Sequence, residues 1–128
     1  MVSTSIPPPL YDLATIQALA RESTYFAANA RARTKLLELG WKTSEIIAFL
    51  TNLTSKHYRG HYLQMSAYDG QRKLDCDAYK MCFDEQNLCE GNSTVDNSHC
   101  WFFVKLALDT DDEGKFTAIV SIHLDSSP

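Results

Sequence analysis

The last third of the chain carries the pattern that most constrains the fold, two runs in which apolar and polar residues alternate. Residues 101–108 and 116–124 each have the two-residue period of a β-strand with one buried face. The segment between them is acidic and contains Gly114, which is typical of a solvated hairpin loop. We therefore expect an antiparallel hairpin here.

Alternation also predicts which side chains of this hairpin share a surface. One apolar face of the second run is expected to comprise Phe116, Ala118, Val120, Ile122 and Leu124. Cross-strand pairing is expected to form a second, more polar surface from Phe103, Lys105, Ser121 and His123. A lysine and a histidine are thus predicted close together outside the core.

The first half of the chain has the apolar spacing of helices, expected over residues 11–21, 28–39 and 43–53. The expected terminal residues are Asp12 as a cap of the first helix, Gly40 at the end of the second, and Thr43 or Ser44 at the start of the third. Further strands are predicted at residues 62–68 and 74–83, with a polar loop over 85–98.

Helices followed by strands predict an α+β class, with N-terminal helices packed on a small antiparallel sheet. With 128 residues, one domain is expected over residues 10–128, after a flexible, proline-containing tail at residues 1–9.

Composition excludes several classes of protein. An apolar fraction of 45% is enough for a folded core, and no apolar run approaches the roughly 20 residues of a membrane span. The N-terminal residues lack the features of a secretory signal, so a cytoplasmic location without a membrane partner is expected. The net charge of −4 disfavours broad, nonspecific binding of nucleic acid but leaves room for a small basic site.

Cationic and aromatic side chains gather where the helices give way to strands. They are Lys56, His57, Tyr58, Arg59, His61 and Tyr62. Such a concentration suggests chemistry on a phosphate, although Arg59 is also a suitable residue to end a helix and the tyrosines are also typical core aromatics. Upstream, Arg31, Arg33 and Lys35 form either a solvated helix surface or a rail for a phosphate backbone.

The four cysteines allow three interpretations. Cys76, Cys82, Cys89 and Cys100 lack the short paired spacing of common zinc sites. Free or buried thiols are therefore the leading expectation, with zinc binding and disulfides as alternatives.

Several short segments resemble one known family in order and spacing over about residues 10–125. They are Tyr11-Asp12-Leu13, Leu39-Gly40, Ile46-Ile47, His57-Tyr58-Arg59-Gly60, Asp77-Ala78-Tyr79-Lys80, Phe103-Val104-Lys105-Leu106 and Ile119-Val120-Ser121-Ile122-His123. Together they resemble the MqsR toxin family. That resemblance implies a RelE-like fold and an mRNA interferase, a toxin of a type II toxin–antitoxin system that a protein antitoxin, often DNA-binding, holds in check.

The chain departs from this family at the positions that carry its chemistry. The family's junction lysine appears here as Arg59, its final-strand lysine as His123 and its strand tyrosine as Phe103. The family's middle-strand glutamine falls near Asp75 or Cys76, and the chain is acidic where the family tends to be basic. Only Arg59 and His123 keep chemical continuity.

Metal-independent RNA cleavage needs a base for the 2′-hydroxyl, cations at the phosphate and an acid for the departing oxygen. The candidate catalytic residues are Arg59, His123, Lys105, His61 and His57, and no cofactor is expected. The candidate RNA-binding residues are Tyr58, Tyr62, Tyr79 and Lys56. The junction and the final hairpin are expected to form opposite walls of one site, although solvent exposure alone also explains Lys105 and His123.

The leading hypothesis is therefore a toxin-like endoribonuclease with mRNA as substrate. Its antitoxin is expected to dock on an exposed edge of the C-terminal sheet. The alternative is a catalytically silent protein-binding module of the same fold.

Overall fold

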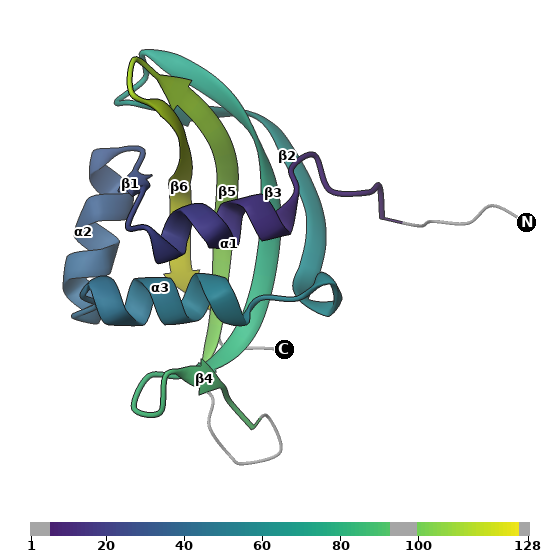
Figure 1. The fold of residues 1–128 in the computed structure, drawn as a ribbon, viewed down its shortest axis with the longest axis vertical. Helices are drawn as coiled ribbons and strands as arrows, with labels where there is room; N and C mark the ends of the chain where they lie inside the picture. The colour runs from purple at the N-terminus through teal and green to yellow at the C-terminus, as the bar shows by residue number, and fades with distance from the viewer. Residues whose placement is uncertain (1–5, 93–99, 126–128) are drawn as a thin grey trace, which may run out of the picture.

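Three α-helices and six strands form within residues 6–92 and 100–125, the parts of the chain that the computed structural model describes (Figure 1). In chain order they are α1 Leu13–Arg21, β1 Tyr25–Ala27, α2 Ala30–Leu39, α3 Thr43–Asn52, β2 Tyr58–Ala67, β3 Arg72–Asp84, β4 Cys89–Glu90, β5 Trp101–Asp111 and β6 Gly114–Leu124. A short 3₁₀ turn, η1 Ser55–His57, joins α3 to β2.

All six strands belong to one mixed sheet, which corrects the predicted fold class. The strand order is β1-β6-β5-β3-β2, with β4 added beside β3. Strand β1 runs parallel to β6, with Phe26 opposite Ala118, and the other pairs are antiparallel. The expectation of N-terminal helices on a small antiparallel sheet of the RelE type is therefore wrong. A three-residue strand between two helices is too short to show a period, and only its tertiary partner makes it a strand.

The helix ends follow local capping chemistry. The Asp12 carboxylate accepts a hydrogen bond from the Thr15 amide at 3.3 Å, and Gly40 ends α2 with a φ of 73°, as the sequence predicted. The predicted cap of α3 was wrong by one residue. Lys42 holds that position, and its amide donates to the Glu45 carboxylate at 2.7 Å.

One face of the sheet is buried under α1 and α3 (Figure 1). The core there is centred on aromatic rings, with Trp41 packed against Phe49 at 5.3 Å and Phe102 at 4.9 Å between ring centroids. Trp41 precedes α3 and packs back on the core, as the sequence predicted. No helix of the described residues is long and apolar enough to cross a membrane.

The opposite face of the sheet is concave because the β2–β3 hairpin curls over it. The Tyr68 amide donates to the carbonyl of Ala28, and the Asp69 carboxylate accepts from the Ala30 amide at 3.2 Å. The floor under this curl is lined largely by small residues, among them Ala67, Cys76, Ala107 and Ala118. Their small volume allows the curled hairpin to come close to the face of the sheet.

A bulge in β6 changes the predicted faces of the last hairpin. Lys105 pairs with Ser121 but Leu106 pairs with Ile119, so Val120 is an extra residue. Ile122 therefore lies on the helix-covered face, whereas Ala118 lies on the concave face. The prediction of a single apolar face for residues 116–124 is therefore wrong. After one inserted residue, the side chains that pointed to one face of the sheet point to the other.

Helix α2 lies beside the half of β6 that β1 leaves uncovered (Figure 1). The Asn29 side chain, which also caps α2, donates to the Val120 carbonyl at 3.0 Å. Within the described residues, the open edge of the main sheet is thus β2. Strand β5 is central and β6 is flanked by β1 and α2, so among the described residues the last hairpin offers no such edge, and antitoxin docking at an exposed edge of the sheet stays a prediction.

Cys82 and Cys100 form a disulfide that joins β3 to the residue preceding β5. The leading expectation of free thiols is wrong for this pair and holds for Cys76, which is buried, and Cys89, which is exposed. The register pairs Cys82 with Trp101 and so places Cys100 nearby, which spacing along the chain does not reveal.

We expect the double variant Cys82→Ala/Cys100→Ala to unfold with a free energy lower by about 3 kcal/mol. The disulfide closes a segment of 18 residues and restricts the unfolded chain. Urea denaturation in non-reducing buffer measures the difference. The reduced wild type should have the stability of the double variant, and Cys89→Ala should leave the urea midpoint unchanged. Equal stability of the oxidised wild type and the double variant would contradict the expectation.

Candidate functional site

Cationic and aromatic side chains of β5 and β6 meet on the concave face. The sequence predicted a common surface for these side chains. Phe103 pairs with His123 and Lys105 with Ser121, which confirms the predicted common surface. The Phe103 and His123 rings stack with centroids 5.3 Å apart. The Lys105 ammonium lies 4.2 Å from the centroid of the Tyr62 ring. Tyr62, Phe103, Lys105, Ser121 and His123 are called the concave cluster below.

Tyr62 reaches this cluster from β2, two strands away from β5. It pairs with Cys76, whose side chain lies in the concave floor, and its ring meets Phe103 edge to face at 6.0 Å. The ring is 41% exposed, so one part of it remains accessible to a ligand. Of the four predicted RNA-binding residues, Tyr62 is the one that the structure places in the cluster.

Helix α2 adds cations to the rim of the cluster. A cavity of ≈ 290 Å³ is lined by Arg31, Ala32, Lys35, Lys105, Ser121, Ile122 and His123. A neighbouring cavity of ≈ 540 Å³ extends under the curled hairpin and shares three of these residues, Arg31, Lys105 and Ser121. The smaller cavity has no acidic lining residue, which makes it suitable for an anion.

The pKa of His123 lies below its usual value. Partial desolvation of the ring has the largest effect, and the nearby charges of Lys105, Lys35 and Lys80 lower the pKa further. Asp125 acts in the opposite direction, and it forms an ion pair with Lys80 at 3.0 Å. His123 is therefore mainly neutral near pH 7, the state in which an imidazole accepts a proton.

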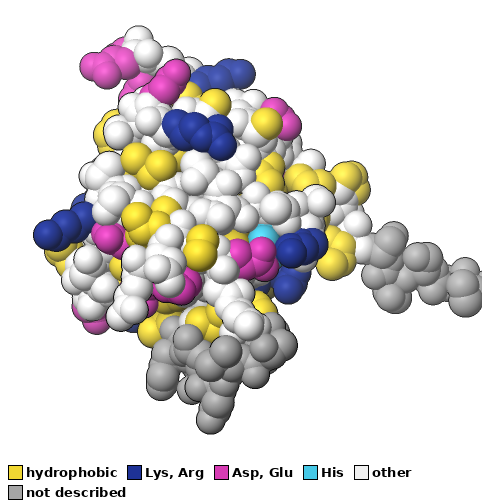
Figure 2. Space-filling view, turned by 60° about the horizontal axis from the view of Figure 1, so that its bottom comes forward, with side chains coloured by type: hydrophobic (Ala, Val, Ile, Leu, Met, Phe, Trp, Pro, Cys, Tyr) yellow, Lys and Arg dark blue, Asp and Glu magenta, His cyan; other side chains and the backbone are white. Residues whose placement is uncertain are grey.

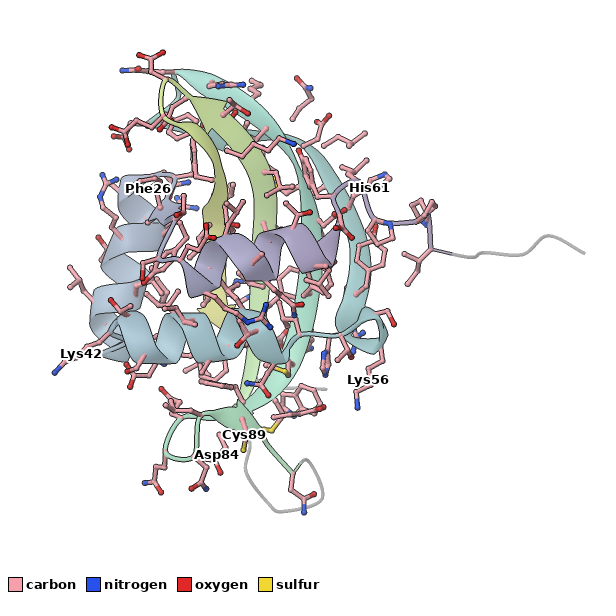
Figure 3. All side chains as sticks on the ribbon, viewed as in Figure 1. Phe26, Lys42, Lys56, His61, Asp84 and Cys89 are labelled. Carbon is pink, nitrogen blue, oxygen red and sulfur yellow. A yellow bond between two sulfur atoms is a disulfide. The ribbon has the colours of Figure 1, made fainter. Side chains whose placement is uncertain are left out.

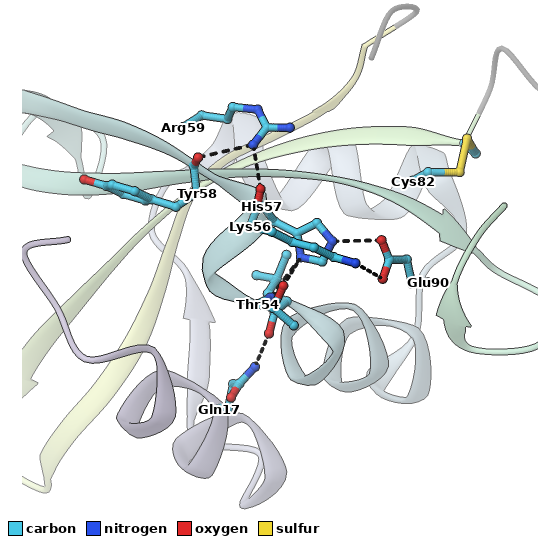
Figure 4. A network of polar contacts seen from close by, with 10 residues as sticks. Gln17, Thr54, Lys56, His57, Tyr58, Arg59, Cys82 and Glu90 are labelled. Atoms are coloured by element: carbon cyan, nitrogen blue, oxygen red, sulfur yellow. Dashed lines mark hydrogen bonds and ion pairs between the residues drawn. A yellow bond between two sulfur atoms is a disulfide. The ribbon is translucent and has the colours of Figure 1, made fainter. Parts of the chain in front are cut away.

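His57 is a structural residue of the junction. It is buried, its Nδ1 accepts from the Thr54 amide at 2.8 Å, and its Nε2 lies 3.0 Å from the Glu90 carboxylate (Figure 4). The same carboxylate lies 3.5 Å from the Lys56 ammonium. These contacts fasten η1 to β4 and leave His57 away from the concave cluster, so the predicted catalytic role has no support in its placement.

Lys56 is exposed and extends from the η1 turn (Figure 3). Basic and acidic side chains alternate over the face drawn in Figure 2, which is turned forward from the bottom of Figure 1. For Lys56 itself, the neighbouring charge is the Glu90 carboxylate at 3.5 Å, which disfavours a polyanion there. The predicted RNA-binding role of Lys56 is therefore not supported by its surroundings.

Arg59 lies at a bulge of β2. Tyr58 pairs with Tyr79 and His61 with Asp77, so Arg59 and Gly60 together face Ala78, the β3 partner of Lys105. Arg59 therefore shares a rung of the sheet with Lys105, although its guanidinium donates to the carbonyls of Lys56 at 3.0 Å and Tyr58 at 3.2 Å (Figure 4). The side chain is exposed and is anchored only at its own turn.

His61 lies on the rung of Asp77, beside the segment that precedes α1 (Figure 3). Asp77 is fully buried, and its carboxylate accepts from the amides of Leu10 and Tyr11, each at 2.9 Å. The Nδ1 atom of His61 is buried without a hydrogen-bond partner among the described residues. His61 thus lies beside the Asp77 carboxylate that attaches the N-terminal segment, and it is separate from the concave cluster.

Tyr58 and Tyr79 support the helix-covered core. Their rings pack at 5.5 Å, and Tyr79 is 1% exposed. Burial raises the pKa of Tyr79 to about 12. The buried Tyr79 ring cannot stack on a base, and Tyr58 is half-buried against the same core, which agrees with the core interpretation of these two tyrosines.

The sequence does not identify four members of the site as site residues. Phe103 and Ser121 are predicted on the shared surface without a role, and Arg31 and Lys35 are predicted with Arg33 either as a solvated helix surface or as a phosphate rail. The missing signal is the position of α2 beside β6, a tertiary contact. Only the four-residue spacing of Arg31 and Lys35 indicated that these two share one helix stripe.

The described residues contain no group of three or more His, Cys, Asp or Glu side chains that could hold a metal ion. Burial raises the pKa of the Cys76 thiol to about 12, so that cysteine is a packing residue. Comparison with family models, curated proteins and solved structures finds no match to this chain.

We expect Lys105→Met to raise the pKa of His123 and Asp125→Asn to lower it. The first change removes a cation that opposes protonation, and the second removes an anion that favours it. Histidine resonances followed by NMR between pH 4 and 9 measure both shifts. Lys73→Met removes an equal charge from the distant end of β3 and should leave His123 unchanged; a wild-type pKa at or above 6.5 would contradict the assignment.

Proposed function

We propose that this chain is a metal-independent endoribonuclease that cleaves mRNA, a toxin similar in role to the MqsR family. The observation that carries the proposal is the convergence of His123, Lys105 and Tyr62 with Phe103 on one concave face. A neutral imidazole can act as the base of RNA cleavage, an ammonium can bind the phosphate, and aromatic rings beside them can contact the bases of a single strand. The cytoplasm, where mRNA is translated, is the proposed place of action.

The proposed reaction proceeds without a covalent enzyme intermediate. His123 accepts the proton of a ribose 2′-hydroxyl while that oxygen bonds to the adjacent phosphorus. The bond from phosphorus to the 5′-oxygen breaks, and the products are a 2′,3′-cyclic phosphate and a 5′-hydroxyl. Lys105 and the Ser121 hydroxyl stabilise the charge on the phosphoryl oxygens. The departing 5′-oxygen takes a proton from solvent, since no second imidazole of the described residues lies in the cluster.

Arg59 is a supporting residue in this proposal. Its rung position beside Lys105 allows the guanidinium to turn toward a bound phosphate if it leaves the two carbonyls of its own turn. Because arginine stays protonated, its role is to bind charge and not to transfer a proton.

The antitoxin is also part of the proposal. Strand β2 is the open edge of the main sheet in the described part of the chain, and it carries the exposed side chains of Tyr62 and Leu63. An added strand from an inhibitor would pair here and come close to Tyr62 of the cluster. Such binding would block the substrate without covering His123 directly.

We expect Lys105→Met/His123→Gln to abolish cleavage. Loss of the base alone should reduce the rate by about 10²–10⁴-fold, and loss of the phosphate cation should reduce it further. Purified wild type and variant are compared on a labelled mRNA with EDTA present, and the products are tested for cyclic phosphate ends. Induced expression of the wild type should arrest growth, whereas the variant should not.

The matched control is Lys73→Met/His61→Gln, which removes one lysine and one histidine outside the concave cluster. It should retain cleavage if it remains folded by circular dichroism. Harmless expression of wild type and variant alike, with intact RNA in both reactions, would reject the nuclease and favour the silent binding module.

A further inference from the structure

The cations of α2 lie beside the concave cluster but take no part in the reaction as described above. Arg31 and Lys35 line the smaller cavity together with Lys105, Ser121 and His123. We propose that Arg31 and Lys35 bind successive backbone phosphates of a single-stranded RNA next to the phosphate that is cleaved. This inference rests on the proposed function and identifies the part of the site that holds the substrate.

The distance between the two α2 cations is close to the distance between two same-face residues of a strand. Arg31 shares both cavities with Lys105 and Ser121, whereas Lys35 lines only the cavity that contains His123, and its charge acts on the His123 ring. Four helical residues advance by about 6 Å, and two strand residues by about 6.6 Å. Arg31 and Lys35 on α2 are therefore spaced nearly as far apart as Ser121 and His123 on β6, and all four line the smaller cavity.

The two neighbouring cavities that share Arg31, Lys105 and Ser121 are called the groove below. The third basic residue of α2 lies outside it. Arg33 is directed to Asp69, with 3.9 Å between guanidinium and carboxylate, and it lines neither cavity. Lys35 lies 3.7 Å from Glu38, but both side chains are substantially exposed, and an exposed pair of this kind contributes little stability. A phosphate can displace Glu38 at small cost.

The charge of the groove favours a polyanion over a neutral ligand. Arg31, Lys35 and Lys105 converge on a cavity without an acidic lining residue, in a chain whose net charge is −4. Like charges held together repel one another, and a bound anion relieves this repulsion. The neighbouring rings of Tyr62 and Phe103 add stacking surfaces for bases, which favours single-stranded RNA over an acidic peptide.

The test measures binding separately from cleavage. A fluorescent 12-nucleotide 2′-O-methyl RNA of mixed sequence cannot be cleaved by 2′-hydroxyl attack, and its binding is followed by anisotropy from 50 to 200 mM salt. Arg31→Gln/Lys35→Gln is compared with Arg21→Gln/Arg33→Gln, which removes the same charge outside the groove. Arg31→Lys/Lys35→Arg keeps both charges and should bind the RNA as the wild type does. It tests the proposal even if Arg31→Gln/Lys35→Gln folds poorly.

Removal of two phosphate contacts should reduce the salt dependence of log K by about 1.4, because each contact to single-stranded nucleic acid contributes about 0.7. Affinity at the lowest salt should fall about tenfold or more, while the control should retain at least half of the wild-type affinity. On a cleavable RNA of the same length, the groove variant should have a raised KM with kcat little changed.

The outcomes separate this inference from the nuclease proposal. Groove-dependent binding without cleavage by the wild type supports the inference and rejects the nuclease. Cleavage by the wild type with equal binding by groove variant and control rejects the inference and leaves the nuclease standing. Undetectable binding of the 12-nucleotide RNA by the wild type also rejects the role of Arg31 and Lys35. Tighter wild-type binding of an acidic 12-residue peptide than of the RNA would reject RNA as the occupant.

Discussion

The curl of the β2–β3 hairpin over one face of the sheet is the constraint on which the candidate site depends. It is held where the Tyr68 amide and the Asp69 carboxylate bond to the segment that enters α2. At the same turn end of the hairpin, the Tyr68 hydroxyl donates to Asp109 at 2.6 Å, and Arg72 pairs with the same carboxyl group at 3.0 Å. Without this curl, Tyr62 would lie too far from β5 for its ring to meet Lys105 and Phe103. The concave cluster is therefore a consequence of sheet curvature.

The helix-covered face provides the rigid support for that curvature. Tyr79, Val104 and Ile122 lie on this face and are buried against α1 and α3, while their chain neighbours point into the concave side. Because strand neighbours alternate, each buried residue fixes the direction of the functional residue next to it. Packing of Ile122 in the core thus orients both Ser121 and His123.

Electrostatics explain how an acidic chain can present an anion site. Several carboxylates are engaged in structural contacts, such as Asp77 with the N-terminal segment and Glu90 with His57. Others lie at the β5–β6 turn, away from α2. Net charge is a property of the whole chain, whereas a ligand responds to the local field. Composition alone could only permit a basic site, and the placement of α2 beside β6 forms it.

The sequence by itself determined the helices, the antiparallel strands of the last hairpin and the common surface of Phe103, Lys105, Ser121 and His123, because these depend on local periods and on a short connection. Tertiary structure decided what periodicity cannot encode. It paired the three residues of β1 with β6, inserted Val120 as a bulge, brought Cys82 to Cys100, held His57 in structural contacts and placed His61 away from the concave cluster. Each of these outcomes depends on residues far apart in the chain, so no local pattern could reveal it. The same reason separates Tyr62, which enters the concave cluster, from Tyr58, which is packed beneath the helices.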